Sequence, residues 1–202
     1  MTGTVFVVDD DEAIRDALGW LFQSRGVTTR GFASGEDFLA EWNAGLAGCL
    51  LLDIRMGGMS GIELFDRLRD SGCRLPVLFL TGHGDVPMAV SALKKGARDF
   101  VEKPFNDNEL VDRVLEALDW DAKRRRDEAG SASVAQRLAG LSPRERQVME
   151  QVLAGRLNKI IADELGITMR TVEVHRANVF AKMGVKTAVE LAQLLSSHRL
   201  EG

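Results

Sequence analysis

Five strand-like runs, each followed by a segment with helical periodicity, fill the first 118 residues of this 202-residue chain. The strand-like runs are aliphatic and β-branched, and strands are expected at residues 4–8, 27–32, 49–53, 76–81 and 98–102. Helices are expected near residues 12–24, 35–43, 61–70, 86–95 and 107–118. Continuous apolar strands that alternate with helices are typical of a parallel sheet covered on both faces. The sequence therefore predicts a doubly wound, five-stranded parallel α/β domain over residues 1–118.

Composition and short apolar runs exclude several other classes of protein. Hydrophobic residues make up 45% and charged residues 28% of the chain, which is ordinary for a soluble globular protein. The longest apolar runs, at 49–52 and 76–80, are too short to cross a bilayer, and the N-terminus enters a strand rather than a signal peptide. Cys49 and Cys73 have neither metal-ligand spacing nor a disulfide framework. We therefore expect a cytoplasmic protein with free thiols and no membrane partner.

The net charge of −4 is unevenly distributed along the chain. Residues 1–118 carry 12 basic and 19 acidic side chains, a net charge of −7, whereas residues 119–202 carry 14 and 11, a net charge of +3. Nucleic acid attracts basic surfaces, so the second part of the chain is the better candidate for contact with DNA.

Residues 119–139 combine a charge run with small residues, and we interpret them as a helical or flexible linker. From residue 140 onward the pattern is helical, with helices expected near 143–154, 158–165, 169–183 and 188–196. Ser142, Pro143 and Glu145 form a strong helix-start signal. Two helices joined by a tight turn at Gly166 indicate a helix-turn-helix, so residues 140–202 are predicted to be an all-α, four-helix domain.

Polar side chains gather where the predicted strands end. Three aspartates follow the first strand at residues 9–11, Asp53 ends the third, Thr81 ends the fourth, and Lys103 follows the fifth. Doubly wound sheets place their sites at the carboxyl ends of the strands. Crowded carboxylates repel one another unless a cation lies among them, and Mg²⁺ prefers oxygen ligands. A carboxylate at this edge can act as a nucleophile and form an acyl phosphate.

Four segments resemble the motifs of receiver domains, in the same order and across the whole first domain: VDDDE at 8–12, LDIRM at 52–56, LTGHG at 80–84 and EKPF at 102–105. The resemblance implies a flavodoxin-like fold and a cis Lys103–Pro104 bond. It also implies roles for seven residues: Asp53 as phosphoacceptor; Asp9, Asp10, Asp53 and the Arg55 main-chain carbonyl around Mg²⁺ or Mn²⁺; Thr81 and Lys103 on the phosphoryl oxygens; and Phe100 as the aromatic switch.

One position departs from the receiver pattern, because Gly57 stands where receivers usually carry proline. Glycine adds backbone freedom, so we expect a looser loop without loss of chemistry. In receivers, the residues equivalent to Arg55 and His83 flank the path of the attacking water. The resemblance therefore suggests that both tune the lifetime of the phosphoryl group.

Three segments of the second domain resemble the LuxR-type helix-turn-helix of the FixJ and NarL regulators: LSPRERQV at 141–148, NKIIA at 158–162 and RTVEVHRAN at 170–178. Val172, Val179 and Phe180 have core-like spacing, which leaves the outer face of their helix for a major groove. His175 is expected to pack within the helix. The expected DNA contacts are Glu173, Val174, Arg176 and Ala177 on base edges, and Lys159, Thr171, Asn178 and Lys182 on phosphates.

Together these resemblances identify the chain as a member of the two-component response regulators, a non-enzymatic transcriptional regulator. They imply a sensor histidine kinase, promoter DNA and RNA polymerase as partners, and a homodimer through the fourth helix and fifth strand of the receiver. FixJ-like proteins are mostly activators. Residues 140–202 have a net charge of only +2, with nine basic and seven acidic side chains, so tight DNA binding is expected to need a dimer.

The sequence leaves three alternatives open. Aspartyl-phosphate hydrolases also place a nucleophilic Asp after an apolar strand, but they use a second Asp two residues on, where this chain has Arg55. A DNA-binding regulator whose receiver works without phosphate would tolerate Gly57. A four-helix interaction module would have exposed basic residues that are merely solvated.

Overall fold

The computed structural model describes residues 3–82 and 86–197. The chain divides into two compact units, residues 1–124 and residues 125–202. None of the described helices is both long enough and apolar enough to cross a membrane.

The first unit contains a five-stranded parallel sheet with the strand order β2-β1-β3-β4-β5. The strands are β1 (Thr4–Val8), β2 (Thr28–Phe32), β3 (Gly48–Asp53), β4 (Val77–Thr81) and β5 (Asp99–Glu102). The helices are α1 (Glu12–Ser24), α2 (Gly35–Glu41), α3 (Gly61–Asp70), α4 (Val86–Lys94) and α5 (Asp107–Ala139). Apart from the end of α5, these bounds lie within two residues of the predicted ones. The predicted doubly wound parallel sheet is therefore confirmed.

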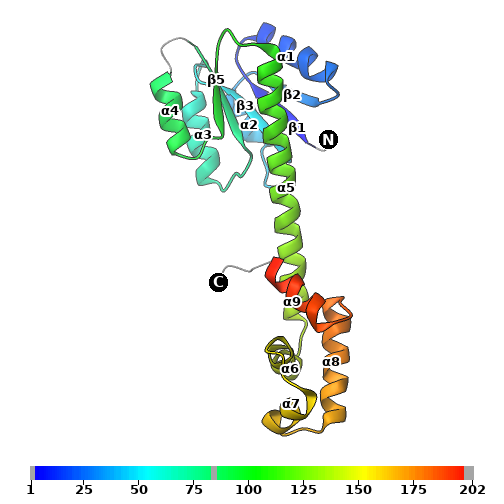
Figure 1. The fold of residues 1–202 in the computed structure, drawn as a ribbon. Helices are drawn as coiled ribbons and strands as arrows, with labels where there is room; N and C mark the ends of the chain where they lie inside the picture. Colours follow the sequence, from blue (N-terminus) through cyan, green and yellow to red (C-terminus); the bar gives the residue numbers. More distant parts are fainter. Residues whose placement is uncertain (1–2, 83–85, 198–202) are drawn as a thin grey trace. The chain divides into compact units, whose positions relative to one another are not determined.

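Each face of the sheet carries its own apolar core, because alternate residues of a strand point to opposite faces. Phe6 and Val8 of β1 belong to the core shared with α2, α3 and α4, whereas Val5 and Val7 belong to the core shared with α1 and α5. Figure 1 shows α3 and α4 on one side of the sheet and α5 on the other. Gly48 allows β1 and β3 to pair, since a Cβ there would lie 1.9 Å from the Thr4 carbonyl oxygen and its φ is +140°.

Helix α5 is longer than predicted, because it continues through the segment expected to be a linker. The Asn106 Oδ1 atom accepts hydrogen bonds from the backbone N–H groups of Asn108 and Glu109, at 2.9 and 3.2 Å, and so caps the first turn. Further along the helix, Asp121 is 2% exposed and accepts a 3.0 Å hydrogen bond from the Gly48 N–H. This buried contact ties the helix to the start of β3 and explains why the first unit extends to residue 124.

The second unit contains the C-terminal part of α5 and four shorter helices, namely α6 (Pro143–Leu153), α7 (Asn158–Leu165), α8 (Met169–Met183) and α9 (Ala188–Ser197). The predicted helix start at Ser142 is confirmed as a capping box with Glu145. Gly166 ends α7 in the left-handed region, with φ 63°, and α8 follows directly. The helix-turn-helix predicted from the sequence is therefore present (Figure 1).

Candidate functional site

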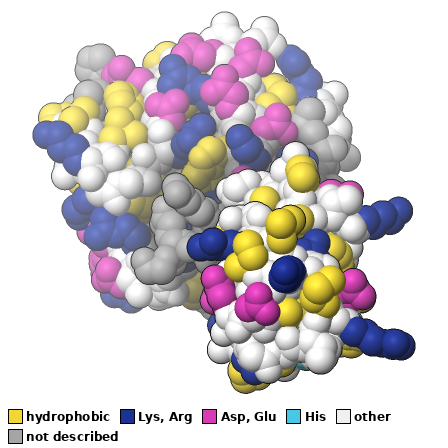
Figure 2. All heavy atoms as spheres, turned by 60° about the horizontal axis from the view of Figure 1, so that its bottom comes forward, with side chains coloured by type: hydrophobic (Ala, Val, Ile, Leu, Met, Phe, Trp, Pro, Cys, Tyr) yellow, Lys and Arg dark blue, Asp and Glu magenta, His cyan; other side chains and the backbone are white. Residues whose placement is uncertain are grey.

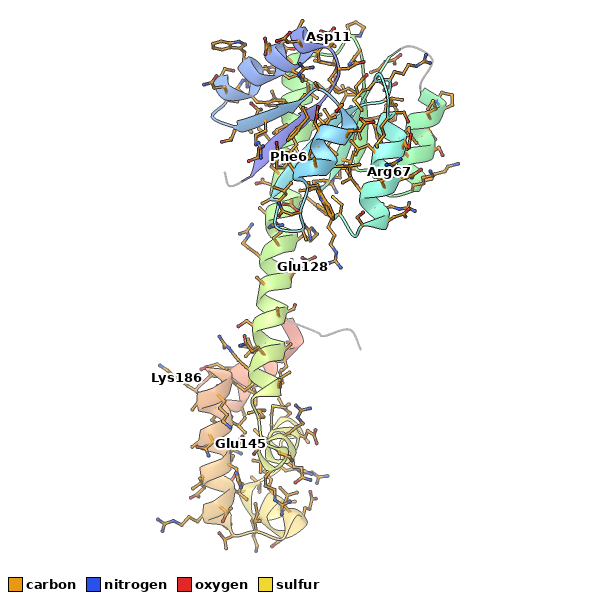
Figure 3. All side chains as sticks on the ribbon, turned by 180° about the vertical axis from the view of Figure 1, so that it is seen from behind. Phe6, Asp11, Arg67, Glu128, Glu145 and Lys186 are labelled. Carbon is orange, nitrogen blue, oxygen red and sulfur yellow. The ribbon has the colours of Figure 1, made fainter. Side chains whose placement is uncertain are left out.

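The carboxyl ends of β1, β3, β4 and β5 meet at one edge of the parallel sheet, where the expected site residues lie. In Figure 3, Asp11 marks this edge, and Phe6 lies within β1 on the way to it. The Asp11 side chain accepts a 2.8 Å hydrogen bond from the Ala13 N–H and begins α1. The Asp9 Oδ1 atom accepts the Asp11 N–H at 2.9 Å. The turn after β1 therefore holds the Asp9 side chain in place through its own backbone.

Three carboxylates form a tight cluster at this edge. One oxygen from each of Asp9, Asp10 and Asp53 lies within 4.8 Å of the other two. Asp9 and Asp53 are 1% and 8% exposed, whereas Asp10 is exposed. Clustered carboxylate oxygens are hard ligands, and one face open to solvent leaves room for water and a phosphoryl oxygen. The donor set therefore fits Mg²⁺ or Mn²⁺.

Lys103 lies between two of these carboxylates. Its Nζ donates hydrogen bonds to Asp9 Oδ2 and to Asp53 Oδ1, each at 2.9 Å. The Lys103 backbone N–H donates to the Thr81 carbonyl at 2.7 Å, which fixes the start of the loop after β5. The Lys103–Pro104 bond is cis, as the resemblance to receivers predicts. The sheet edge thus brings together an ammonium and carboxylates that lie 94 and 50 residues away in the chain.

Burial and neighbouring charges both shift the pKa values of Asp53 and Lys103. Burial raises the pKa of Asp53 above its usual value, and the neighbouring Asp9 and Asp10 add to this, although Lys103 opposes it. Burial opposes ionisation of Lys103 as well, but its hydrogen bonds to Asp9 and Asp53 raise the Lys103 pKa above its usual value. The lysine therefore stays charged and partly compensates the buried acids.

Thr81, Phe100 and Arg55 are the remaining residues expected at this site. The Thr81 side chain is fully buried, and its Oγ1 donates a 3.0 Å hydrogen bond to the Gly82 carbonyl. Phe100 on β5 is half-buried and packs against the core beneath α3 and α4. Arg55 is exposed, two residues after Asp53. His83, which was expected to act beside Arg55, lies outside the described residues.

Two glycines near the cluster have structural roles that the sequence did not reveal. A Cβ at Gly61 would lie 2.0 Å from the Asp53 carbonyl oxygen, so glycine is needed where α3 begins against the end of β3. The Gly57 backbone N–H donates a 2.8 Å hydrogen bond to Asp10 Oδ2. The loop at Gly57, which was expected to be looser, is therefore bonded to the carboxylate cluster. Proline, which lacks an N–H, could not form this bond.

The second unit presents one face of α8 to solvent. Val172, Val179 and Met183 are buried. Most of the residues expected to contact DNA are exposed, namely Lys159, Glu173, Val174, Ala177, Asn178 and Lys182. The other two, Thr171 and Arg176, are half-buried. Figure 2 shows the end of the second unit, where basic, acidic and hydrophobic side chains are mixed and the visible basic side chains form no continuous surface. This mixture agrees with the low net charge of residues 140–202.

Several of these side chains already have partners within the unit. The Arg176 guanidinium lies 5.5 Å from the centroid of the Phe180 ring, and Thr171 Oγ1 lies 2.8 Å from Thr168 Oγ1. His175 is half-buried, as expected for a residue that packs within the helix, and its Nδ1 is buried without a hydrogen-bond partner among the described residues.

Lys182, an expected phosphate contact, is engaged in an ion pair. Its Nζ lies 2.6 Å from Glu145 Oε2 and 3.2 Å from the Gly140 carbonyl oxygen. Glu145, labelled in Figure 3, is buried at the start of α6 and also accepts the Ser142 N–H at 2.8 Å. The Lys182 and Ser142 bonds lower the Glu145 pKa to about 2. The sequence predicted the cap but not this pair, because the partners are 37 residues apart.

Comparison with known families assigns both units. Residues 5–115 match the model of the response regulator receiver domain, and residues 139–195 match the model of bacterial regulatory proteins of the luxR family. The C4-dicarboxylate transport transcriptional regulatory protein DctR of Rhodobacter capsulatus is 54% identical over 196 residues, which are 96% of this chain and 100% of that protein. The transcriptional regulatory protein FixJ of Bradyrhizobium diazoefficiens is 45% identical over 192 residues, or 95% of this chain and 94% of FixJ.

Solved structures agree with this assignment. The response regulator StyR is 40% identical and superposes with a TM-score of 0.90, over 97% of this chain and 99% of StyR. Full-length FixJ from B. japonicum is 42% identical, with a TM-score of 0.62 over 100% of both chains. With the acidic sheet edge and the helix-turn-helix in place, these matches show that the chain belongs to the two-component response regulators with a LuxR-type DNA-binding domain and is a transcriptional regulator.

Proposed function

We propose that the chain is a phosphorylation-dependent regulator, in which a sensor histidine kinase transfers a phosphoryl group to Asp53. The observation that carries this proposal is the cluster at the sheet edge, where Asp53 lies 2.9 Å from the Lys103 ammonium and beside two further carboxylates. A cap or turn aspartate would not need such neighbours. The proposal keeps a receiver over residues 1–118, a linker over 119–139 and a DNA-binding domain over 140–202.

In the proposed transfer, a carboxylate oxygen of Asp53 attacks the phosphorus, the bond to the kinase histidine breaks, and an acyl phosphate forms. A Mg²⁺ or Mn²⁺ ion held by Asp9, Asp10, Asp53 and the Arg55 main-chain carbonyl would neutralise charge on the phosphoryl oxygens. Lys103 would exchange its bond to Asp53 for one to a phosphoryl oxygen while retaining its bond to Asp9. The receiver itself catalyses only its own phosphorylation and dephosphorylation.

The new charge would then change the surface made by α4 and β5. The Thr81 hydroxyl would leave the Gly82 carbonyl for a phosphoryl oxygen, and Phe100 would move inward into the space vacated. The α4 side chains Met88 and Val90 are 44% and 39% exposed. Exposed apolar side chains on this helix support a homodimer that forms through α4 and β5.

In the DNA-binding domain, we propose that Glu173, Val174, Arg176 and Ala177 meet base edges in the major groove of promoter DNA. The phosphates would be held by Lys159, Thr171, Asn178 and Lys182. Lys182 would contact its phosphate while it remains ion-paired with Glu145. Two such domains in a dimer would reach two half-sites and compensate for the low charge of each. Contact with RNA polymerase would make the protein an activator, acting on DNA in the cytoplasm.

The test compares wild type with Asp53→Asn, with and without Mg²⁺ and acetyl phosphate. Oligomeric state is measured by light scattering, and binding by fluorescence anisotropy on DNA selected from a random library by the wild-type protein. The matched control is Asp70→Asn, which makes the same change at an exposed position on α3. We expect wild type and control to dimerise and bind DNA more tightly with acetyl phosphate, and Asp53→Asn not to respond. If all three respond alike, the phosphorylation switch is wrong and only the DNA-binding function stands.

A further inference from the structure

A cavity of about 420 Å³ lies at the opposite edge of the receiver sheet from the carboxylate cluster. Pro76, just before β4, and Arg98, just before β5, both line it, so it opens at the amino ends of these strands. The floor of the cavity is apolar and buried, and it consists of Phe65, Leu68, Leu75, Val77 and Ala97. Trp120 of α5, 41% exposed, forms an aromatic side wall. Nothing in the phosphorylation chemistry uses this cavity.

The charged side chains that line the cavity are all basic. They are Arg69, Arg74, Lys95, Arg98 and Arg124, and the described lining contains no aspartate or glutamate. Residues 1–118 have a net charge of −7 and only 12 basic side chains, yet four of those 12 border this one cavity. In an acidic domain, such a gathering of cations around an apolar floor marks a site for an anion with an apolar body.

Not all of these charges are compensated by acids. Lys95 pairs with Asp66 at 2.7 Å, and Arg124 pairs with Asp121. Arg69 instead donates to a neutral partner, the Lys95 carbonyl oxygen, at 2.7 Å. The Arg98 guanidinium lies over the Trp120 ring, 5.4 Å from its centroid. Within the part of the chain that the structure describes, Arg69 and Arg98 thus border the cavity without a carboxylate partner.

The cavity walls are held together before any ligand binds. The bond from Arg69 to the Lys95 carbonyl and the pair between Lys95 and Asp66 join α3 to the turn after α4. Asp121 anchors α5, and so the Trp120 wall, through its bond to the Gly48 N–H. A preformed site binds more tightly because little ordering is needed on binding.

We propose that this cavity binds a small organic carboxylate with a flat apolar body of about two fused rings. A cavity of roughly 150 Å³ holds one benzene ring, so about 420 Å³ accommodates two rings and a carboxylate. The rings lie on the floor beside Trp120, and the carboxylate faces Arg98 and Arg69, whose planar guanidinium groups match it. Such a ligand gives the receiver a chemical input separate from Asp53.

The probe is 2-naphthoate, titrated into the full chain by calorimetry, with the neutral isostere 2-naphthamide and the phosphate analogue 2-naphthyl phosphate as further arms. Arg98→Gln removes one uncompensated charge, and the matched control Arg67→Gln makes the same change on the exposed side of α3, outside the cavity. We expect saturable binding of 2-naphthoate to the wild-type chain. Arg98→Gln should weaken this binding about tenfold, and Arg67→Gln should leave it unchanged. The wild-type chain should bind 2-naphthamide about tenfold more weakly than 2-naphthoate.

A second measurement locates the ligand without relying on a variant. Cys73 lines the cavity and is partly exposed, whereas Cys49 is fully buried. Saturating 2-naphthoate is therefore expected to slow alkylation of Cys73 by iodoacetamide. The proposal is overturned if binding does not saturate by about 1 mM, if both arginine variants weaken it equally, or if Cys73 is not protected. Tighter binding of 2-naphthyl phosphate with the same dependence on Arg98 would overturn the choice of a carboxylate.

Discussion

Replacing Gly57 by proline removes the backbone N–H that donates to Asp10 Oδ2 at 2.8 Å. A hydrogen bond to a charged acceptor contributes about 1.5–3 kcal/mol when buried, but Asp10 is exposed, so about 0.5–1 kcal/mol is expected here. The proline also makes the unfolded chain stiffer, which returns a similar amount of stability. We therefore expect little change in the free energy of unfolding.

The change should appear instead in metal binding, because the lost bond orients a candidate ligand. A loss of about 0.5–1 kcal/mol corresponds to a weakening of Mg²⁺ affinity by about twofold to fivefold. Gly57→Ala is the matched control, because alanine keeps the N–H and its Cβ would contact only Asp10 Oδ2 at an ordinary 3.7 Å. Mg²⁺ titrations followed by NMR of backbone amides near the site measure both variants. If alanine and proline weaken Mg²⁺ binding equally, or proline has no effect, the reasoning about this hydrogen bond is refuted.

Three further predictions concern other parts of the chain. Glu145→Gln should lower the free energy of unfolding by about 1–2 kcal/mol at pH 7, a value reduced because the Lys182 side chain is 44% exposed. The folded-state pKa of Glu145, about 2, is below its ordinary 4.5, so this stability is present above pH 4.5 and is lost as the pH falls towards 2. Urea unfolding of wild type and Glu145→Gln at pH 7 and pH 3 measures the free-energy difference between them. A difference of the same size at both pH values would contradict this prediction. Gly61→Ala should destabilise the receiver by about 3 kcal/mol or more, because its Cβ would meet the Asp53 carbonyl at 2.0 Å; a melting temperature within a degree or so of wild type would contradict this. Arg176→Ala should weaken binding to selected DNA by about tenfold, by anisotropy, without changing the melting temperature; unchanged affinity would remove Arg176 from the interface.

The order and type of the elements, and the strand ends that carry the site residues, follow from local features of the amino-acid sequence. Local periodicity and caps encode helices and strands, and parallel strands must end at one edge, so Asp9, Asp53, Thr81 and Lys103 had to gather there. The Ser142 cap was equally local, since both partners lie within one turn.

The pairing of these side chains, in contrast, depends on the three-dimensional fold. The bonds from Gly57 to Asp10 and from Lys182 to Glu145 join residues 47 and 37 positions apart, and no periodicity encodes them. The hydrogen bond from the Gly48 N–H to the buried Asp121 likewise joins distant residues, and the first unit therefore extends beyond residue 118, where α5 was predicted to end. Such contacts depend on packing in three dimensions, where the distance between two side chains is set by the elements that carry them rather than by their separation in the chain.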